Sequence, residues 1–308
     1  MGALWLVAST ACFSSMWMMI RYGGRELHVF EVSFFRFLFG LAFMAPLMWR
    51  RGGRAWRTRR LRDHGLNGVF QVVASNCTFL GVTLIQLAEV TALTFTAPLF
   101  ATAGAALFLG EQVGLRRWTA TAVGFLGALI ILRPGLQAVS LPAVIVLVGS
   151  AFIAAGILAS RSLARTERPE TIVLYLTLLM AVFSAPAAAV VWTAPTAAAL
   201  AWLAGAGLAG TLGLTCMACA YRVAEASAVM PFRYASILFA ALYGYVLFGE
   251  VPDLWTWVGA AIIVAAALYT ARREAQLARK ARAARAGVSA EAVDATTMAR
   301  VDRGRAGS

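Results

Sequence analysis

Charged side chains are scarce in this sequence, and so are the residues that bind nucleotides. Charged residues make up 13% of the chain, whereas soluble globular domains average about 25%. The sole lysine is Lys280, near the C-terminal end, so the chain has no Gly-x-x-x-x-Gly-Lys loop to hold a nucleotide phosphate. A soluble globular protein is therefore disfavoured, and transport driven by the chain's own ATP hydrolysis is excluded.

Histidine and cysteine are also few, and their positions suit little chemistry. His28 and His64 fall in opposite loops, so no acid–base pair is predicted and no catalytic residue is assigned. Cys216 and Cys219 form a Cys-x-x-Cys inside an apolar run, with no histidine or second cysteine pair nearby. We interpret all four cysteines as small apolar residues. The sequence thus predicts no metal site and no cofactor.

Long apolar runs are abundant instead. Hydrophobic residues make up 61% of the chain, and the mean hydropathy is +0.76. A helix of about 20 apolar residues spans the hydrocarbon core of a bilayer. Ten such runs can be placed, near residues 4–21, 29–49, 66–86, 90–110, 116–133, 141–160, 171–192, 198–221, 226–249 and 253–271. The first lacks a basic start and a small-residue cleavage site, so we interpret it as a retained span rather than a signal peptide.

The net charge of +13 is unevenly placed along the chain. If the N-terminus is cytoplasmic, the inner loops hold thirteen arginines and the tail from Arg272 adds nine basic residues, against three arginines in the outer loops. Basic residues accumulate on the cytoplasmic side of membrane proteins, so both termini are predicted to be cytoplasmic. The basic loop 50–64 is predicted to touch anionic lipid headgroups, with no nucleic acid as a partner.

One motif occurs twice. A shift of 139 residues superimposes Gly110-Glu111 on Gly249-Glu250, and also Trp118 on Trp257. The chain is therefore divided into repeats 1–135 and 136–272 and a basic, disordered tail 273–308. Because five spans is an odd number, the second repeat enters the membrane the other way up, which places Glu111 at the cytoplasmic face and Glu250 outside.

Inverted repeats are the architecture of secondary transporters, whose substrate site lies near the midplane between the repeats. The predicted fold is all-α integral membrane, with ten transmembrane helices in two inverted five-helix repeats. Polar, aromatic and proline residues inside the spans are the candidates for the substrate site: Trp17, Arg36, Gln71, Ser75, Asn76, Phe95, Tyr175, Arg233 and Tyr234, with Pro98 and Pro231 as helix kinks.

Each kind of candidate has a structural alternative. Arg36 could instead tie down carbonyl groups or a neighbouring helix, and the amides Gln71 and Asn76 could bond helices together. The aromatic residues could be ordinary core. Arg233 could bond a carbonyl or Tyr175, or it could hold a carboxylate or phosphate of the substrate. Small residues spaced by four, such as Gly205 and Gly213, are predicted helix contacts rather than site residues.

Further phrases resemble a known family. Helices end in Leu-Gly-Glu at 109–111 and Phe-Gly-Glu at 248–250, and residues 93–100 read Leu-Thr-Phe-Thr-Ala-Pro-Leu-Phe. With ten spans in inverted repeats, the chain resembles the EamA branch of the drug/metabolite transporter superfamily over residues 4–271. The resemblance implies a central cavity and the transport of small metabolites. Residues 34–40 and 248–253 are similar to carriers of S-adenosylmethionine or riboflavin, in which an acid often stands where this chain has Arg233, so a cationic substrate is disfavoured.

The leading hypothesis is thus a secondary transporter in a bacterial-type inner membrane, acting as a monomer or homodimer on a small organic substrate that is anionic, zwitterionic or aromatic. An amino-acid or drug exporter of the same fold is an alternative. Two other classes stay open: a membrane receptor or scaffold that has lost transport, and an enzyme acting on lipid-borne substrates, which the missing acid–base pair disfavours. Flux in proteoliposomes separates the first hypothesis from these two.

Overall fold

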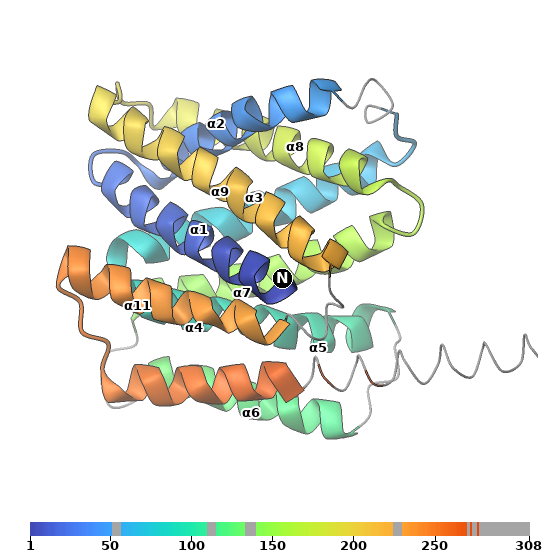
Figure 1. The fold of residues 1–308 in the computed structure, drawn as a ribbon, viewed down its shortest axis with the longest axis vertical. Coiled ribbons are helices and arrows are strands. Elements are labelled where there is room, and N and C mark those ends of the chain that lie inside the picture. The colour runs from blue at the N-terminus through green and yellow to red at the C-terminus, as the bar shows by residue number, and fades with distance from the viewer. Residues whose placement is uncertain are drawn as a thin grey trace, which may run out of the picture. The chain divides into compact units, whose positions relative to one another are not determined.

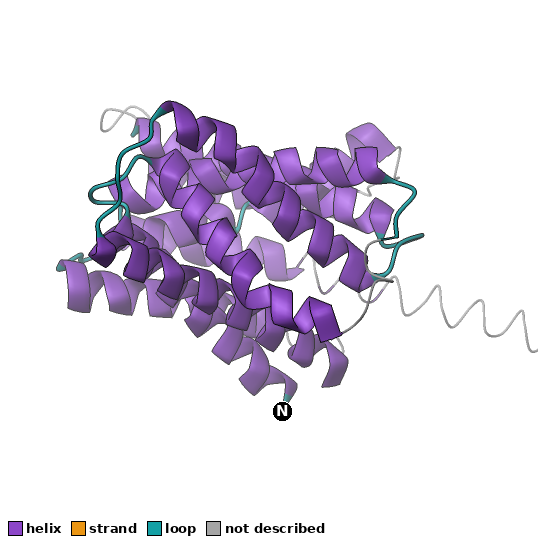
Figure 2. Cartoon of the chain, turned by 90° about the horizontal axis from the view of Figure 1, so that it is seen from above, coloured by secondary structure: helices purple, strands orange, loops and turns teal. Residues whose placement is uncertain are grey.

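The computed structural model describes residues 1–50, 57–109, 115–132, 140–223 and 230–269, with 272 and 276. Contacts divide the chain into Met1–Leu268 and Tyr269–Ser308, and everything below concerns the first unit. Every regular element in the described residues is a helix (Figure 2). The predicted tail 273–308 lies outside the described residues, apart from Gln276.

The helices follow the apolar runs of the sequence (Figure 1). In chain order they are α1 (Gly2–Gly23), α2 (Val29–Arg50), α3 (Leu61–Leu84), α4 (Leu87–Thr94), α5 (Ala97–Leu109), α6 (Leu115–Leu132), α7 (Leu141–Leu163), α8 (Pro169–Val190), α9 (Ala197–Val223), the 3-10 helix η2 (Met230–Tyr234), α11 (Ala235–Phe248) and a last helix, Leu254–Tyr269.

Six stretches are long and apolar enough to cross a membrane: Gly2–Gly23, Val29–Pro46, Leu87–Leu107, Leu141–Leu163, Thr171–Val190 and Ala197–Ala220. Shorter apolar helices lie at Trp118–Leu132, Phe232–Phe248 and Leu254–Tyr269. Helix α3 is not among the six because polar residues such as Asn67, Gln71 and Asn76 lower its hydropathy. The chain is therefore a multi-span helical protein, and the count of ten spans stays a prediction.

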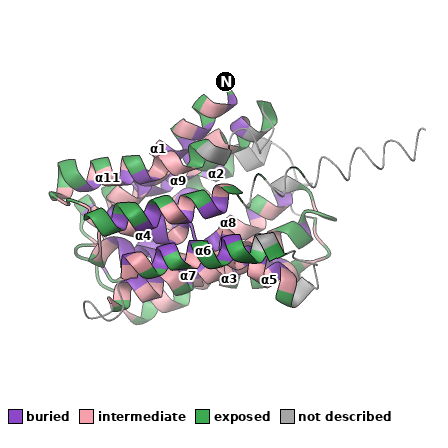
Figure 3. Cartoon of the chain, turned by 90° about the horizontal axis from the view of Figure 1, so that it is seen from below, coloured by how far each residue is buried: buried purple, intermediate pink, exposed green. Residues whose placement is uncertain are grey.

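Figure 3 shows exposed residues on the outward faces of several helices, and many exposed residues of this protein are large and apolar. On α11, Leu238, Leu242 and Val246 are spaced by four residues and are all more than half exposed. Exposed apolar side chains in such a row would be unfavourable in water, but they suit contact with lipid.

Small residues bring the helices together. Added Cβ atoms at Gly205 and Gly213 of α9 would lie 3.0 Å from Met19 Sδ and 3.2 Å from Phe13 of α1. The prediction that these two glycines are helix contacts is therefore confirmed. The last helix meets α6 in the same way, because a Cβ at Gly259 would lie 2.6 Å from the carbonyl oxygen of Gly127.

Loops gather at two ends of this unit, to the left and right of Figure 1. We call the first the Glu31 end; there Thr193 and Thr196 donate hydrogen bonds to Glu31 and Glu26. The second is the Arg60 end, where Arg60 donates to the carbonyl oxygen of Ser162. Successive helices run from one end to the other. In the predicted topology the Glu31 end is external and the Arg60 end is cytoplasmic.

Two helices are interrupted near their predicted kinks. The predicted span 90–110 breaks between α4 and α5, where the Phe95 N–H donates to the carbonyl oxygen of Ala92 at 3.1 Å. Pro98 has no N–H to donate to the carbonyl of Thr94, which explains why the helix is broken here rather than only bent. The second interruption is the 3-10 helix η2, which contains Pro231 and leads into α11.

Candidate functional site

A cavity of about 400 Å³ lies among the helices. Its lining on α1 runs from Leu6 to Trp17, and on α8 from Leu176 to Met180. Helices α1 and α8 both start at the Arg60 end. Because these lining residues belong to the part of each helix from its first turns to its middle, the cavity extends from the middle of the bundle toward that end. Its size is within the range of small-molecule sites.

Most of the predicted site residues line this cavity. They come from α1, α2, α3, the α4–α5 break and η2, which are far apart in the sequence. The predicted residues in the lining are Trp17, Arg36, Gln71, Ser75, Phe95 and Arg233, together with the kink residue Pro98. The side chain of Pro231 lies outside the described residues.

Three predicted residues do not belong to the described lining. Asn76 accepts a hydrogen bond from Ser33 Oγ at 2.5 Å, so it joins α3 to α2, which is the structural alternative for a membrane amide. Tyr175 packs on His64 at the Arg60 end, with ring centroids 4.9 Å apart. The assignment of Asn76 and Tyr175 to the substrate site stays a prediction.

The third, Tyr234, lies directly behind the lining. Its ring packs on Phe95 with centroids 4.7 Å apart and planes inclined by 59°. Phe95 and Tyr234, two of the predicted site residues, thus connect the two interrupted helices. Phe95 faces the cavity, and Tyr234 supports it from the other side.

Arg36 is the cation in the middle of the bundle. Its Nη2 donates to Met16 Sδ at 3.2 Å, and its Nε has no hydrogen-bond partner among the described residues. A Cβ at Gly210 would lie only 2.6 Å from Nη2, so the glycine makes room for the guanidinium. A thioether is a weak acceptor, and the guanidinium also lies over the ring of Phe37, 4.7 Å from its centroid, so neither of these two contacts brings a negative charge to Arg36.

The nearby acid Glu31 does not neutralise Arg36. It is fully buried and accepts hydrogen bonds from the Thr193 N–H at 2.7 Å and the His28 N–H at 3.0 Å. Its role is to tie the start of α2 to the loop before α9.

Arg233 reaches the cavity from η2, and its side chain is exposed there. Its carbonyl oxygen accepts a hydrogen bond from Ser236 Oγ at 3.1 Å. Within the described residues, Arg36 and Arg233 are the two charged residues of the lining, and no acid is among them. The electrostatics of the cavity therefore favour a negative group.

Hydroxyl groups form a polar part of the lining that the sequence-based analysis missed. Ser9, Ser14, Thr78, Thr177 and Thr211 belong to it. Several donate to a backbone carbonyl: Thr78 Oγ1 to Ala74 at 2.9 Å and Thr211 Oγ1 to Gly207 at 2.9 Å. Serine and threonine hydroxyls donate to backbone carbonyls throughout membrane helices. Their positions in the sequence therefore do not show which of them line a cavity.

Comparisons with known proteins agree with this arrangement. The sequence model of the EamA-like transporter family matches residues 1–133 and 141–272. A riboflavin transporter of Rhizobium johnstonii is 33% identical over 282 residues, which cover 91% of this chain and 93% of that protein. An S-adenosylmethionine uptake transporter of Rickettsia felis is 31% identical over 269 residues, which cover 87% and 91%.

A solved crystal structure shows the same fold. It shares 19% sequence identity and a TM-score of 0.59, and the match covers 88% of this chain and 98% of the other. The apolar helices, the cavity and the match of the family model to residues 1–133 and 141–272 lead to one assignment. The chain belongs to the EamA-like transporter family, and it is a multi-pass membrane protein that transports metabolites rather than an enzyme.

Proposed function

We propose that this protein carries a small organic metabolite with an anionic group across the bacterial inner membrane by alternating access. The observation that carries the proposal is the charge of the cavity: two arginines line it, and no acid does among the described residues. Helices around this site would move so that it opens to one side of the membrane at a time.

An arginine within a membrane needs a partner, because its guanidinium stays charged. The structure offers Arg36 the sulfur of Met16 and the ring of Phe37, and neither carries a negative charge. Arg233 has no ion pair among the described contacts, and its side chain is exposed into the cavity. A carboxylate or phosphate of the substrate would supply the missing charge, with bidentate contacts as the favoured geometry.

The rest of the lining suits an aromatic body. Trp17 and Phe95 offer ring faces, and Gln71 and Ser75 offer a hydrogen-bonding edge one helical turn apart on α3. The names of the two relatives, riboflavin transporter and S-adenosylmethionine uptake transporter, both refer to substrates with fused aromatic rings. We therefore infer a substrate that combines such a ring with an acidic group.

Riboflavin and riboflavin 5′-phosphate form a matched pair of ligands for the test, because they differ in the phosphate. Binding to purified protein is measured for the wild type, Arg36→Gln and Arg233→Gln. We expect the wild type to prefer the phosphate form, and each substitution to weaken its binding by at least tenfold, or about 1.4 kcal/mol. Binding of the neutral form should change much less.

Arg222→Gln is the matched control, because Arg222 is an exposed arginine of α9 outside the cavity lining. It should leave both affinities unchanged. If neither cavity arginine affects the preference for the phosphate form, the anionic-substrate proposal is wrong. Flux of the bound ligand into proteoliposomes then tests transport itself.

Topology is tested separately. We propose that both termini are cytoplasmic and that the Glu31 end faces outward. A reporter fused after Ser308 should be cytoplasmic, and one inserted between Thr193 and Ala199 should be external. Both reporters on one side would contradict the inverted-repeat arrangement.

A further inference from the structure

We propose that Glu250 is the latch of an outer gate, which closes the cavity at the Glu31 end and must open once in every transport cycle. The inference rests on the proposed alternating access, and it assigns a function to the Phe-Gly-Glu motif at 248–250. It depends on the contacts of one carboxylate and on where those contacts lie relative to the cavity.

The carboxylate of Glu250 joins three elements. One oxygen forms an ion pair with Arg21, in the last turn of α1. The other accepts a hydrogen bond at 3.0 Å from the N–H of Leu87, the first residue of α4. Glu250 itself directly follows the end of α11, so α1, α4 and α11 meet at a single side chain.

Two glycines, Gly249 of the motif and Gly244 of α11, explain how Glu250 reaches this position. Gly249 has φ +66°, a left-handed conformation that favours glycine, and it ends α11. The chain then turns back, so that the Glu250 N–H donates to the carbonyl oxygen of Gly244 at 2.9 Å. A Cβ at Gly244 would lie 2.8 Å from Glu250 Oε2, so a larger residue there would displace the carboxylate.

Aromatic rings surround the ion pair. Arg21 lies over the ring of Phe248 at 4.5 Å, and Tyr22 packs on Phe248 at 5.0 Å and on Trp202 at 4.9 Å. The side chains of Arg21 and Glu250 are only 18% and 11% exposed. A pair shielded in this way is screened less by water and salt than a surface pair.

On α1 and α4 the latch lies just beyond the cavity. On α1 the described lining ends at Trp17, one turn before Arg21. On α4 it begins at Thr91, one turn after Leu87. The space between is filled by buried side chains such as Ile20. A substrate leaving toward the Glu31 end would have to separate these helices, and so would have to break the contacts of Glu250.

Removing one partner should therefore favour the outward-open state, because it leaves the closed state with an uncompensated charge. The experiment measures access to the cavity from the Glu31 end. Ser14, which lines the cavity, is replaced by cysteine in a background where Cys12, Cys77, Cys216 and Cys219 are serine. A membrane-impermeant thiol reagent is added to the external face of vesicles of known orientation.

We expect Glu250→Gln to raise the labelling rate of the reporter cysteine at least fivefold, and Arg21→Gln to do the same from the other side of the ion pair. Glu26→Gln is the matched control, since Glu26 lies at the same end but bonds Thr196. It should leave the rate unchanged. Thermal unfolding checks that each variant is folded, and the two latch variants serve as independent tests if one of them fails to fold.

An unchanged labelling rate in a folded Glu250→Gln or Arg21→Gln variant would overturn the latch. The measurement uses no substrate, so its result is independent of the anionic-substrate proposal. If the labelling rate is unchanged but the cavity arginines still select the phosphate ligand, the latch proposal is wrong and the anionic-substrate proposal is unaffected.

Discussion

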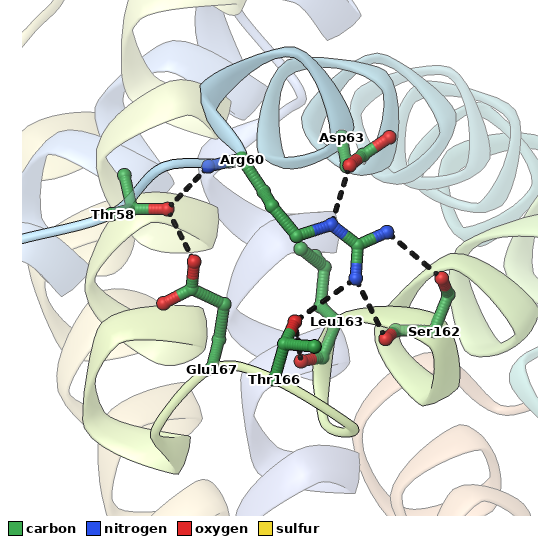
Figure 4. A network of polar contacts seen from close by, with 7 residues as sticks. All are labelled: Thr58, Arg60, Asp63, Ser162, Leu163, Thr166 and Glu167. Carbon is green, nitrogen blue, oxygen red and sulfur yellow. Dashed lines mark hydrogen bonds and ion pairs between the residues drawn. The ribbon is translucent and has the colours of Figure 1, made fainter.

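The Glu31 end and the Arg60 end of the bundle use the same local device to join their loops. At the first, Thr196 Oγ1 donates to Glu26 at 2.8 Å and accepts from the Ala199 N–H. At the second, Thr58 Oγ1 donates to Glu167 at 2.7 Å and accepts from the Arg60 N–H (Figure 4). The threonine precedes α9 in one case and α3 in the other, close to the shift of 139 residues between the two copies of the motif.

The two ends differ in the further contacts that accompany this threonine–glutamate pair. At the Arg60 end, Arg60 bonds the carbonyl and hydroxyl of Ser162 and forms an ion pair with Asp63, which braces α3 against α7 (Figure 4). At the Glu31 end, Glu250 joins α1, α4 and α11 beside the cavity. The counterpart of Glu250, Glu111, lies outside the described residues.

The two ends therefore contain two kinds of contact: structural contacts that stay intact during transport, and the Glu250 contacts, which we expect to break when the cavity opens. The loop braces connect helices of the first half to helices of the second half, and they should persist through the transport cycle. The Glu250 contacts connect elements that flank the substrate path, and they should break. Substitutions in a brace should thus reduce stability, whereas substitutions in the latch should change access.

The largest loss of stability is expected for Glu31→Ala. Glu31 is fully buried, and the Thr193 N–H would lose its acceptor. Unsatisfied buried groups cost about 1–3 kcal/mol each, so we expect the free energy of unfolding to fall by about 3 kcal/mol. Chemical unfolding in detergent measures it, with Arg222→Gln, at an exposed position of α9, as the control. A variant as stable as the control would show that Glu31 is not a brace.

The sequence predicted the parts of this comparison that depend on local patterns. Apolar runs located the helices because a membrane span must be long and apolar, and proline located the break near Phe95 because it removes a backbone donor. Arg36 and Arg233 stood out because a charge within a span is costly. These residues line the cavity, as the sequence-based analysis proposed.

Contacts between distant segments were not predictable. Gln71 and Asn76 are amides on the same helix, yet one lines the cavity and the other bonds Ser33. Helix α3 packs against protein on several sides, so no polar face marks which amide is which. The latch was missed for the same reason: nothing near Glu250 in the sequence indicates that its partner is Arg21.

A smaller effect is expected at the Arg60 brace. The Arg60 and Asp63 side chains are 30% and 44% exposed, so water screens their ion pair. Arg60→Gln should lower the free energy of unfolding by about 1 kcal/mol or less, and high salt should reduce the difference from the wild type. Chemical unfolding at two salt concentrations measures this. A folded variant that loses transport would show instead that the brace takes part in the cycle.

A pH-dependent effect is expected from His64, which precedes the predicted span 66–86 at the Arg60 end. Its side chain is buried, and neither ring nitrogen has a hydrogen-bond partner among the described residues. Burial lowers the pKa of His64 below its usual value of about 6.5. The charges of Glu167 and Asp63 raise this pKa, and Arg60 lowers it, but burial is the larger cause.

A histidine with a lowered pKa in the folded state takes up its proton more readily when unfolded. Its contribution to stability is present above pH of about 6.5 and is lost as the pH falls from there through the folded-state pKa. In that window one such group changes the free energy of unfolding by at most about 1.4 kcal/mol per pH unit. His64→Phe keeps a ring against Tyr175 and removes the titration. Between pH 7.5 and 5 the free energy of unfolding should depend less on pH in this variant than in the wild type. The same pH dependence in both proteins would show that His64 does not link protonation to folding.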